Sequence, residues 1–418
     1  VSDLLDSPQS PAYETTGTNP SLTLTFPSKF PSNNAPDDEL GDGTTLTVEA
    51  TASNTSGSSG PKTATVQPEV VSVGPTNWTE ASDYPIDFVQ GIGYYKQNGL
   101  DHWILGRNNY QYCYTTNLGQ SWTQKSSTAY HTHSNFAYSE THNRLVSVHG
   151  GNQTYNMYSD DAGATFQIAS GGSGTYDYLP AVVANPDGSF TATGGGGNGY
   201  QGFWHSTDGT SWSKFQTLTT VSSWQGITYG GTDLGQTKWI AWADNNGLLA
   251  ASTGANSNFS VIKTGTNKYA TGVAYGNGVW VLTGTLNNEP FLEISKDNGV
   301  SWTDITDNYP KENGDYVNTI PNKGLIFYNG WFIAVNSSNK ILLSQNGEDW
   351  ELQEVTTDTN TAFNKVVAGA DKVMLTAANK SVYFADLPSI RSLTQEEFNE
   401  QALKFATYTN RKHVECGR

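Results

Sequence analysis

Short apolar segments alternate with turns rich in Asn and Gly along most of this chain. Apolar residues predominate at positions 103–105, 145–148, 239–242, 279–282 and 331–335, and a polar turn follows each segment. Apolar runs of this length, broken by Asn and Gly, predict β-hairpins. The turns contain, in order, Asn109, Asn152, Asn198, Asn245, Asn287, Asn339 and Asn379. The pattern therefore predicts seven groups of three strands.

An aromatic residue recurs at nearly constant spacing through the same region. The steps between successive members are 44, 44, 46, 47, 43 and 48 residues. A period of this length, filled with short strands, predicts the blades of a β-propeller. The members are Trp78, Trp122, Phe166, Trp212, Phe259, Trp302 and Trp350. We therefore expect an all-β fold with a seven-bladed propeller at residues 73–388.

Most of these aromatic residues close a short polar motif. Residues 159–166 read S-x-D-x-G-x-T-F and residues 295–302 read S-x-D-x-G-x-S-W, whereas the copy before Phe259 has decayed. The motif resembles the Asp-box, or bacterial neuraminidase repeat, of propeller proteins. Its Asp or Asn can accept hydrogen bonds from its own turn, and its Gly supplies a positive φ, so we expect a structural role. The positions concerned are Asn117, Asp161, Asp208, Asp297 and Asn346.

The strands at the two ends of this region predict how the ring closes. Trp78 belongs to an outer strand that no inner strand precedes, while the last triplet, residues 366–385, has no outer strand after it. We therefore predict a seventh blade built from one amino-proximal strand and three carboxy-proximal strands. Such a blade leaves no open sheet edge.

The two flanks differ in composition from the repeats. Residues 1–72 are rich in Pro, Ser, Thr and Gly, and residues 45–68 resemble the last two strands of an immunoglobulin-like or fibronectin type III module. In residues 389–418, Thr394 and Glu397 form a capping box ahead of an amphipathic pattern. We expect a small immunoglobulin-like module before the propeller and a short helix after it.

Charge and hydropathy narrow the possible partners. The net charge of −17 argues against nucleic acid and anionic membranes as partners. No apolar run is long enough to span a membrane, and residues 1–10 lack a basic and apolar signal pattern. Two cysteines give no disulfide framework. We expect no cofactor, no nucleic acid partner and no membrane insertion.

Asp-box propellers include sialidases, which raises the question of enzymatic activity. Resemblance to a sialidase would imply a propeller with three arginines around the substrate carboxylate. This chain places only Arg107 and Arg144 within the propeller. Lysine does not reproduce the bidentate geometry of a guanidinium. Other glycosidases need two facing carboxylates, and spacing alone does not place any two of the loop acids together. These acids are Asp87, Asp177, Glu289, Asp307, Asp315 and Asp358. We assign no catalytic residue.

The histidines raise the question of a metal site. His131 and His133 share one face of a strand and could be joined by His149 or His102. No Cys or carboxylate completes a recognisable ligand spacing. We therefore interpret these residues as polar groups near an inner strand, and assign no metal.

Recognition is expected on the propeller face opposite the Asp-box turns, because those turns serve the fold. Aromatic side chains interleaved with amides and carboxylates suit stacking on sugar rings and hydrogen bonding to hydroxyls. The candidate ligand-binding residues are Tyr130, His131, Tyr176, Asp177, Tyr178, Tyr200, Trp224, Tyr309 and Tyr316. The alternative interpretation is that these aromatics rim the propeller channel.

Two classes of function remain open. The immunoglobulin-like segment, the Asn and Gly content and the tail resemble appendage proteins of tailed phages, especially those of marine cyanophages. That resemblance implies a non-enzymatic virion protein, such as a tail-fibre component, that binds host-surface glycan. It also implies an extracellular location on the virion, attachment to other virion proteins through both flanks, and oligomerisation within an assembly. The alternative is a secreted carbohydrate-active propeller, either a lectin or a glycoside hydrolase other than a sialidase.

Overall fold

The chain divides into two compact units, Gly74–Pro388 and Val1–Val73 with Ser389–Arg418. The computed structural model describes residues 21–25, 46–54, 57–58, 62–66 and 74–387, apart from residues 82–83, 87, 108–109, 128–130, 150–154, 172–177, 196–200, 222, 244–247, 266, 313–314 and 317–323. The described part contains no helix that is long and apolar enough to cross a membrane.

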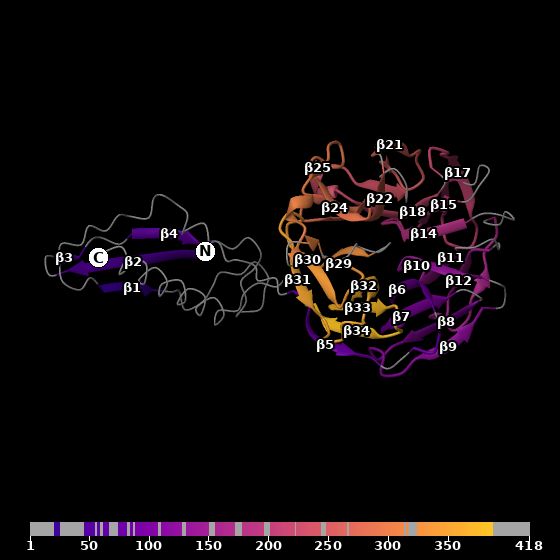
Figure 1. Ribbon diagram of the computed structural model, residues 1–418, viewed down its shortest axis with the longest axis horizontal. Coiled ribbons are helices and arrows are strands. Elements are labelled where there is room, and N and C mark those ends of the chain that lie inside the picture. The colour runs from indigo at the N-terminus through magenta and orange to yellow at the C-terminus, as the bar shows by residue number, and fades with distance from the viewer. Residues whose placement is uncertain are drawn as a thin grey trace. The chain divides into compact units, whose positions relative to one another are not determined.

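The unit Gly74–Pro388 is a ring of seven four-stranded antiparallel sheets (Figure 1). Blade 1 comprises β6 (Val89–Gln97), β7 (Leu100–Arg107), β8 (Gln111–Thr115) and β9 (Thr123–Ser126). Blade 2 comprises β10 (His133–Ser139), β11 (Arg144–His149), β12 (Met157–Ser159) and β13 (Gln167–Ile168). Blade 3 comprises β14 (Tyr178–Ala184), β15 (Phe190–Gly195), β16 (Gly202–Ser206) and β17 (Ser213–Thr217), and blade 4 comprises β18 (Trp224–Gly230), β19 (Lys238–Ala243), β20 (Leu249–Ser252) and β21 (Ser260–Lys263).

The remaining blades follow the same order of strands. Blade 5 comprises β22 (Lys268–Gly276), β23 (Val279–Leu286), β24 (Glu289–Ser295) and β25 (Thr303–Asp304); blade 6 comprises β28 (Leu325–Tyr328), β29 (Trp331–Val335), β30 (Lys340–Ser344) and β31 (Glu351–Glu354); blade 7 comprises β32 (Phe363–Gly369), β33 (Lys372–Ala377), β34 (Val382–Asp386) and β5 (Thr76–Glu80). Two short 3₁₀ helices, η1 (Thr232–Leu234) and η2 (Thr306–Asn308), lie in connections. The prediction of seven blades is confirmed.

Blade 7 closes the ring as the strand count predicts. β5 pairs antiparallel with β34, with Thr76 opposite Asp386 and Glu80 opposite Tyr383. The Trp78 indole donates a hydrogen bond of 3.2 Å to Gln353 Oε1 of blade 6. The amino-proximal strand is therefore joined to its own sheet by backbone pairing and to the neighbouring blade by side chains.

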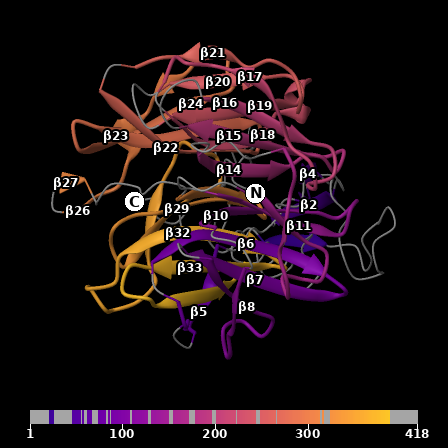
Figure 2. The same ribbon diagram turned by 90° about the vertical axis from the view of Figure 1, so that its right-hand side faces the viewer.

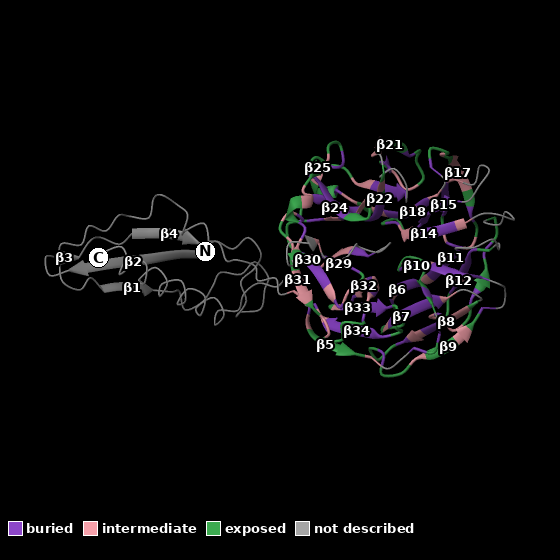
Figure 3. Cartoon of the chain, viewed as in Figure 1, coloured by how far each residue is buried: buried purple, intermediate pink, exposed green. Residues whose placement is uncertain are grey.

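The antiparallel order of strands gives the propeller two distinct faces. We call one the turn face, which carries the hairpins between first and second strands and those between third and fourth strands. The connection face carries the remaining loops, including those that lead from each outer strand to the next inner strand. Burial is greatest in the first three strands of the blades, and exposure increases in the outer strands and loops (Figure 3).

The polar motifs form tight turns on the turn face. In the copy at Asp161, the carboxylate accepts hydrogen bonds from the Thr165 amide (2.9 Å) and the Thr165 hydroxyl (2.6 Å). The Ser159 hydroxyl donates to Asp161 (2.8 Å) and accepts from the Gly163 amide (2.9 Å). The aromatic residue that ends the copy, Phe166, is buried. The Ser and Asp side chains thus accept hydrogen bonds from backbone amides of their own turn, which accounts for the residue types in the motif.

Glycines at the ends of inner strands make room for aromatic rings of the next blade. A Cβ on Gly276 would lie 2.1 Å from the Phe327 ring, and one on Gly369 would lie 2.0 Å from the Tyr94 ring. No side chain larger than hydrogen fits at such a distance. The blades therefore interlock around the ring through a repeated contact of aromatic ring on glycine.

In the other unit, β1 (Ser21–Thr25), β2 (Leu46–Asn54), β3 (Gly57–Ser58) and β4 (Lys62–Val66) form one antiparallel sheet in which β2 pairs with the other three strands. The immunoglobulin-like character of this sheet stays a prediction. The helix predicted within residues 389–418 lies outside the described residues.

Candidate functional site

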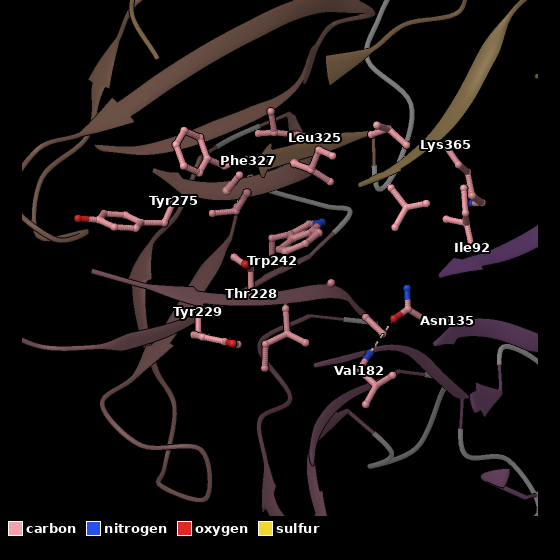
Figure 4. Close-up of a pocket in the computed structure, with 18 of the residues that line it drawn as sticks. Ile92, Asn135, Val182, Thr228, Tyr229, Trp242, Tyr275, Leu325, Phe327 and Lys365 are labelled. Atoms are coloured by element: carbon pink, nitrogen blue, oxygen red, sulfur yellow. Dashed lines mark hydrogen bonds between the residues drawn. The ribbon is translucent and has the colours of Figure 1, made fainter. Parts of the chain in front are cut away.

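A cavity of about 470 Å³ lies along the centre of the propeller. Residues from all seven inner strands line it (Figure 4). It is therefore the central channel of the ring, and its chemistry depends on what each inner strand places there.

The polar lining side chains are concentrated on three neighbouring inner strands. β6 supplies Gln90, β10 supplies Ser134 and Asn135, and β32 supplies Lys365. β6 packs between β10 and β32. The opposite inner strands β14, β18, β22 and β28 supply mainly apolar groups, although Thr228 is also present. The apolar lining residues on these strands include Val182, Ile227, Val273, Leu325 and Ile326.

Asn135 and Lys365 stand at a repeated β-bulge of the inner strands. Six inner strands shift register near their start, and the residue after the shift is Gly or Ala in four of them. Only blades 2 and 7 place a larger polar residue there, namely Asn135 and Lys365. The small residues are Gly91, Ala181, Gly226 and Gly272. Asn135 and Lys365 are therefore the two larger polar side chains at a position where the other four bulged strands carry only Gly or Ala.

Lys365 is the single charged side chain among the lining residues. It is partly buried, and the structure shows no ion pair for it within the described part of the chain. Burial among the inner strands disfavours the ammonium and lowers the pKa of Lys365 to about 8. Lys365 is therefore mostly protonated at pH 7, and its ammonium is partly desolvated.

Asn135 is oriented by the neighbouring blade. Its Oδ1 accepts a hydrogen bond of 3.4 Å from the Val182 amide. The amide nitrogen of Asn135 consequently points away from Val182 (Figure 4). The channel therefore contains an ammonium and an amide NH₂, both of which are hydrogen-bond donors.

Three aromatic rings from neighbouring inner strands lie on one side of the channel at its turn-face end. Tyr229, Tyr275 and Phe327 lie near the carboxyl ends of their inner strands and line the cavity (Figure 4). Tyr275 donates to the carboxylate of Asp233 in the hairpin of blade 4. Burial and this hydrogen bond raise the pKa of Tyr275. The rings stay neutral, so the lining at this end is aromatic, with the Asp233 carboxylate beside Tyr275.

The structure separates the predicted ligand-binding residues into three groups. Tyr130, Tyr176, Asp177 and Tyr200 lie outside the described residues. The side chains of His131, Trp224 and Tyr309 are at most 1% exposed and face the interior, where a surface ligand does not reach them. The prediction that these three rings lie on a recognition surface is therefore corrected. Tyr178 and Tyr316 are partly exposed.

Packing explains the burial of these three side chains. The Trp224 indole donates 3.2 Å to the Leu218 carbonyl, and its ring lies 5.5 Å from that of Phe203. Tyr309 belongs to the core shared by blades 5 and 6. His131 lies within the start of blade 2, where its Nε2 is 3.1 Å from Ser147 Oγ. All three side chains therefore pack in the interior of the fold, although the sequence pattern predicts a role in ligand binding.

Tyr316 lies on an extra hairpin of the connection face. β26 (Lys311–Glu312) and β27 (Asp315–Tyr316) form this two-stranded sheet between blades 5 and 6. It stands clear of the blades in Figure 2. The Lys311 ammonium lies 4.5 Å from the centre of the Tyr316 ring, which packs edge-on against buried Tyr309 at 5.9 Å. Tyr309 thus anchors a hairpin that presents a cation and a ring together.

The histidine cluster is a buried polar group. His133 Nδ1 lies 2.8 Å from the same Ser147 hydroxyl that contacts His131, and burial lowers the pKa of His133 to about 3. His102 lies apart and stacks on Tyr95 with ring centres 4.9 Å apart. In the described part of the chain, no three potential ligands are arranged to hold a metal ion.

None of the loop carboxylates considered for catalysis is among the described residues that line the channel. Asp87 and Asp177 lie outside the described residues. Asp358 accepts hydrogen bonds from the amides of Asn360 and from Thr361 within its own turn. The channel lining contains no Asp or Glu among the described residues.

No protein-family model and no curated protein matches this sequence. Solved structures match the fold. The structure described as "YCF48 bound to D1 peptide" has a TM-score of 0.57 and 11% identity, covering 77% of this chain and 98% of that one. A catalytically inactive virginiamycin B lyase from Staphylococcus aureus with quinupristin gives 0.57 and 11%, covering 75% and 99%. The Pan2 WD40 domain of Neurospora crassa gives 0.53 and 11%, covering 76% and 98%. These similarities show the propeller fold alone. One of the similar structures is a lyase, so the fold does not indicate whether this chain is an enzyme.

Proposed function

We propose that this chain is a non-enzymatic recognition component of a virion appendage or tail fibre, which binds host-surface glycan through the connection face of its propeller. The resemblance of the sequence to tailed-phage appendage proteins suggests the setting. The observation that carries the recognition role is the β26–β27 hairpin, which is anchored by buried Tyr309 and presents Tyr316 beside Lys311.

The chemistry of this hairpin suits a carbohydrate. An aromatic ring stacks on the apolar face of a sugar, and an ammonium beside it donates to hydroxyl or carboxylate groups. Tyr178 begins the inner strand of blade 3, so its backbone also enters from the connection face. Tyrosine side chains have only two rotatable χ angles. Held on a rigid scaffold, they lose little conformational entropy when a ligand binds.

A double variant tests this proposal. Tyr178→Ala with Tyr316→Ala should reduce binding to host cells or isolated surface glycan at least tenfold, since each lost stacking contact removes about 1 kcal/mol. The matched control is Tyr229→Ala, a 38% exposed tyrosine at the turn-face end of the channel. Thermal melting verifies that both proteins are folded. Unchanged adsorption by the double variant, or equal loss in the control, would refute recognition by the connection face.

The flanks are proposed to attach the propeller to other virion proteins and to hold the oligomer. Deleting residues 1–70, or residues 389–418, should leave a folded monomeric propeller that no longer joins its particle. Light scattering measures the oligomeric state, and electron microscopy of particles measures incorporation. Normal assembly of both truncated chains would make the propeller itself the anchor.

A further inference from the structure

We propose that the central channel binds an organic carboxylate with an apolar stem, and that Lys365 and Asn135 hold the carboxylate. This site lies inside the ring, apart from the glycan surface proposed above. It therefore stands or fails independently of that function.

The first argument is the isolation of one positive charge. The chain carries a net charge of −17, yet the described channel lining contains no acid and one lysine. A partly buried ammonium without a carboxylate partner pays desolvation without electrostatic compensation. A ligand carboxylate would supply that missing partner.

The second argument is the placement of donors. Lys365 and Asn135 follow equivalent bulges on β32 and β10, and the strand between them, β6, adds Gln90. Asn135 uses its oxygen toward the Val182 amide, which leaves its NH₂ as the group available to an acceptor. A carboxylate has two acceptor oxygens, so an ammonium and an amide NH₂ on one side of a channel complement it.

The third argument is the apolar wall opposite these donors. Val182, Ile227, Val273 and Leu325 form that wall, and aromatic rings follow toward the turn face. The volume of about 470 Å³ falls in the range of small-molecule sites, which are mostly apolar with a few placed polar groups. The wall therefore fits a hydrocarbon or aromatic stem.

Protonation of Lys365 links this site to pH. Its pKa near 8 means that the free channel loses its charge above that pH, so carboxylate affinity should fall as the pH rises from 7 to 9.5. Tyr229 and Tyr275 are the other titratable groups of the described lining, and burial raises the pKa of each. They stay neutral over this range and do not oppose the effect.

The test uses a matched pair of small probes. Calorimetry should detect 4-phenylbutyrate binding to the full chain at pH 7, with affinity at least tenfold above that of neutral 4-phenylbutanamide. Lys365→Met should remove this preference, and Asn135→Ala should weaken it. Lys125→Met, on outer strand β9, removes an equal charge and serves as the control. Equal binding of acid and amide, or an unchanged acid affinity in Lys365→Met, would overturn the proposal.

A second arm separates free acids from chain termini. A short peptide ending in Phe is tested with a free carboxylate and as the amide. Tight binding of the free peptide alone would assign the site to a chain terminus, and tight binding of phenylbutyrate would assign it to small acids. In the unaltered protein, the NMR shift of the Lys365 Cε should show a raised pKa when either ligand binds. The absence of binding in both arms refutes the site.

Discussion

Replacing Asp297 with Ala should lower the stability of the propeller by about 1–2 kcal/mol at pH 7. The carboxylate accepts hydrogen bonds from the Ser295 hydroxyl (2.7 Å), the Val300 amide (3.1 Å), and the Ser301 amide (2.8 Å) and hydroxyl (2.5 Å). Because this turn is exposed, water replaces part of each bond, and the sum stays well below four full contributions. A loss of this size lowers the melting temperature by roughly 2–5 °C.

The same bonds predict a pH dependence of defined sign. The Ser301 hydroxyl above all holds the pKa of Asp297 down, to about 2 from its ordinary 3.8. A depressed carboxyl pKa stabilises the fold above the ordinary pKa, and that stabilisation disappears as the pH falls from about 4 to 2. The difference between the parent protein and Asp297→Ala should therefore shrink between pH 7 and pH 2.5.

The chain itself supplies the control for this experiment. Asn117 occupies the equivalent position in blade 1, where its Oδ1 accepts from the Ser121 amide (3.1 Å) and its Nδ2 donates to the Ser121 hydroxyl (2.9 Å). Asp297→Asn should therefore melt closer to the parent than Asp297→Ala at pH 7. Differential scanning calorimetry of all three proteins measures this. The reasoning is refuted if Asp297→Ala melts within 1 °C of the parent at pH 7, or if their difference does not change at low pH.

Two further substitutions test the packing of the ring. Gly369→Ala places a Cβ 2.0 Å from the Tyr94 ring and should cost about 2–3 kcal/mol in urea unfolding; a cost below 0.5 kcal/mol would contradict the interlocking contact. Glu293→Ala removes a 3% exposed carboxylate that pairs with Lys263 at 2.8 Å and Lys268 at 2.5 Å. It should cost about 3 kcal/mol by the same measurement, and an unchanged unfolding midpoint would show that water screens the pair.

The blades and their closure could be predicted because they depend on local pattern. Alternating apolar residues and Asn-Gly turns fix a hairpin wherever they occur, and a constant period repeats that unit. The strand count predicts that Trp78 belongs to the last blade, and the pairing of Thr76 with Asp386 confirms it. These inferences need no knowledge of which side chains meet across the ring.

The channel site could not be predicted in the same way, because it depends on contacts between distant strands. The sequence neighbours of Trp224 suggest a rim residue, but its ring packs against Phe203 of blade 3, between blades 3 and 4. Local sequence reasoning does not single out Lys365, although the sequence contains a signal for it. Aligning the inner strands on Gly91 and Gly272 places Lys365 at the same position, where a long charged side chain is out of pattern.

The pairing of β5 with β34 also determines how the propeller would respond to mechanical load. A pull on residues 73 and 388 first loads the hydrogen bonds of Pro75 with Gln353 and of Leu387 with Asn329 and Asp371. It then reaches Thr76 and Asp386, which lie opposite each other at one end of the same antiparallel pair. The tension then acts across the strands and breaks their hydrogen bonds one after another, instead of shearing all of them at once. The bond of 2.7 Å from Asn77 to Asp386 stands near the point of entry. Stretched through its flanks, the ring would peel open at this seam under low force, while the other six blades keep their strands.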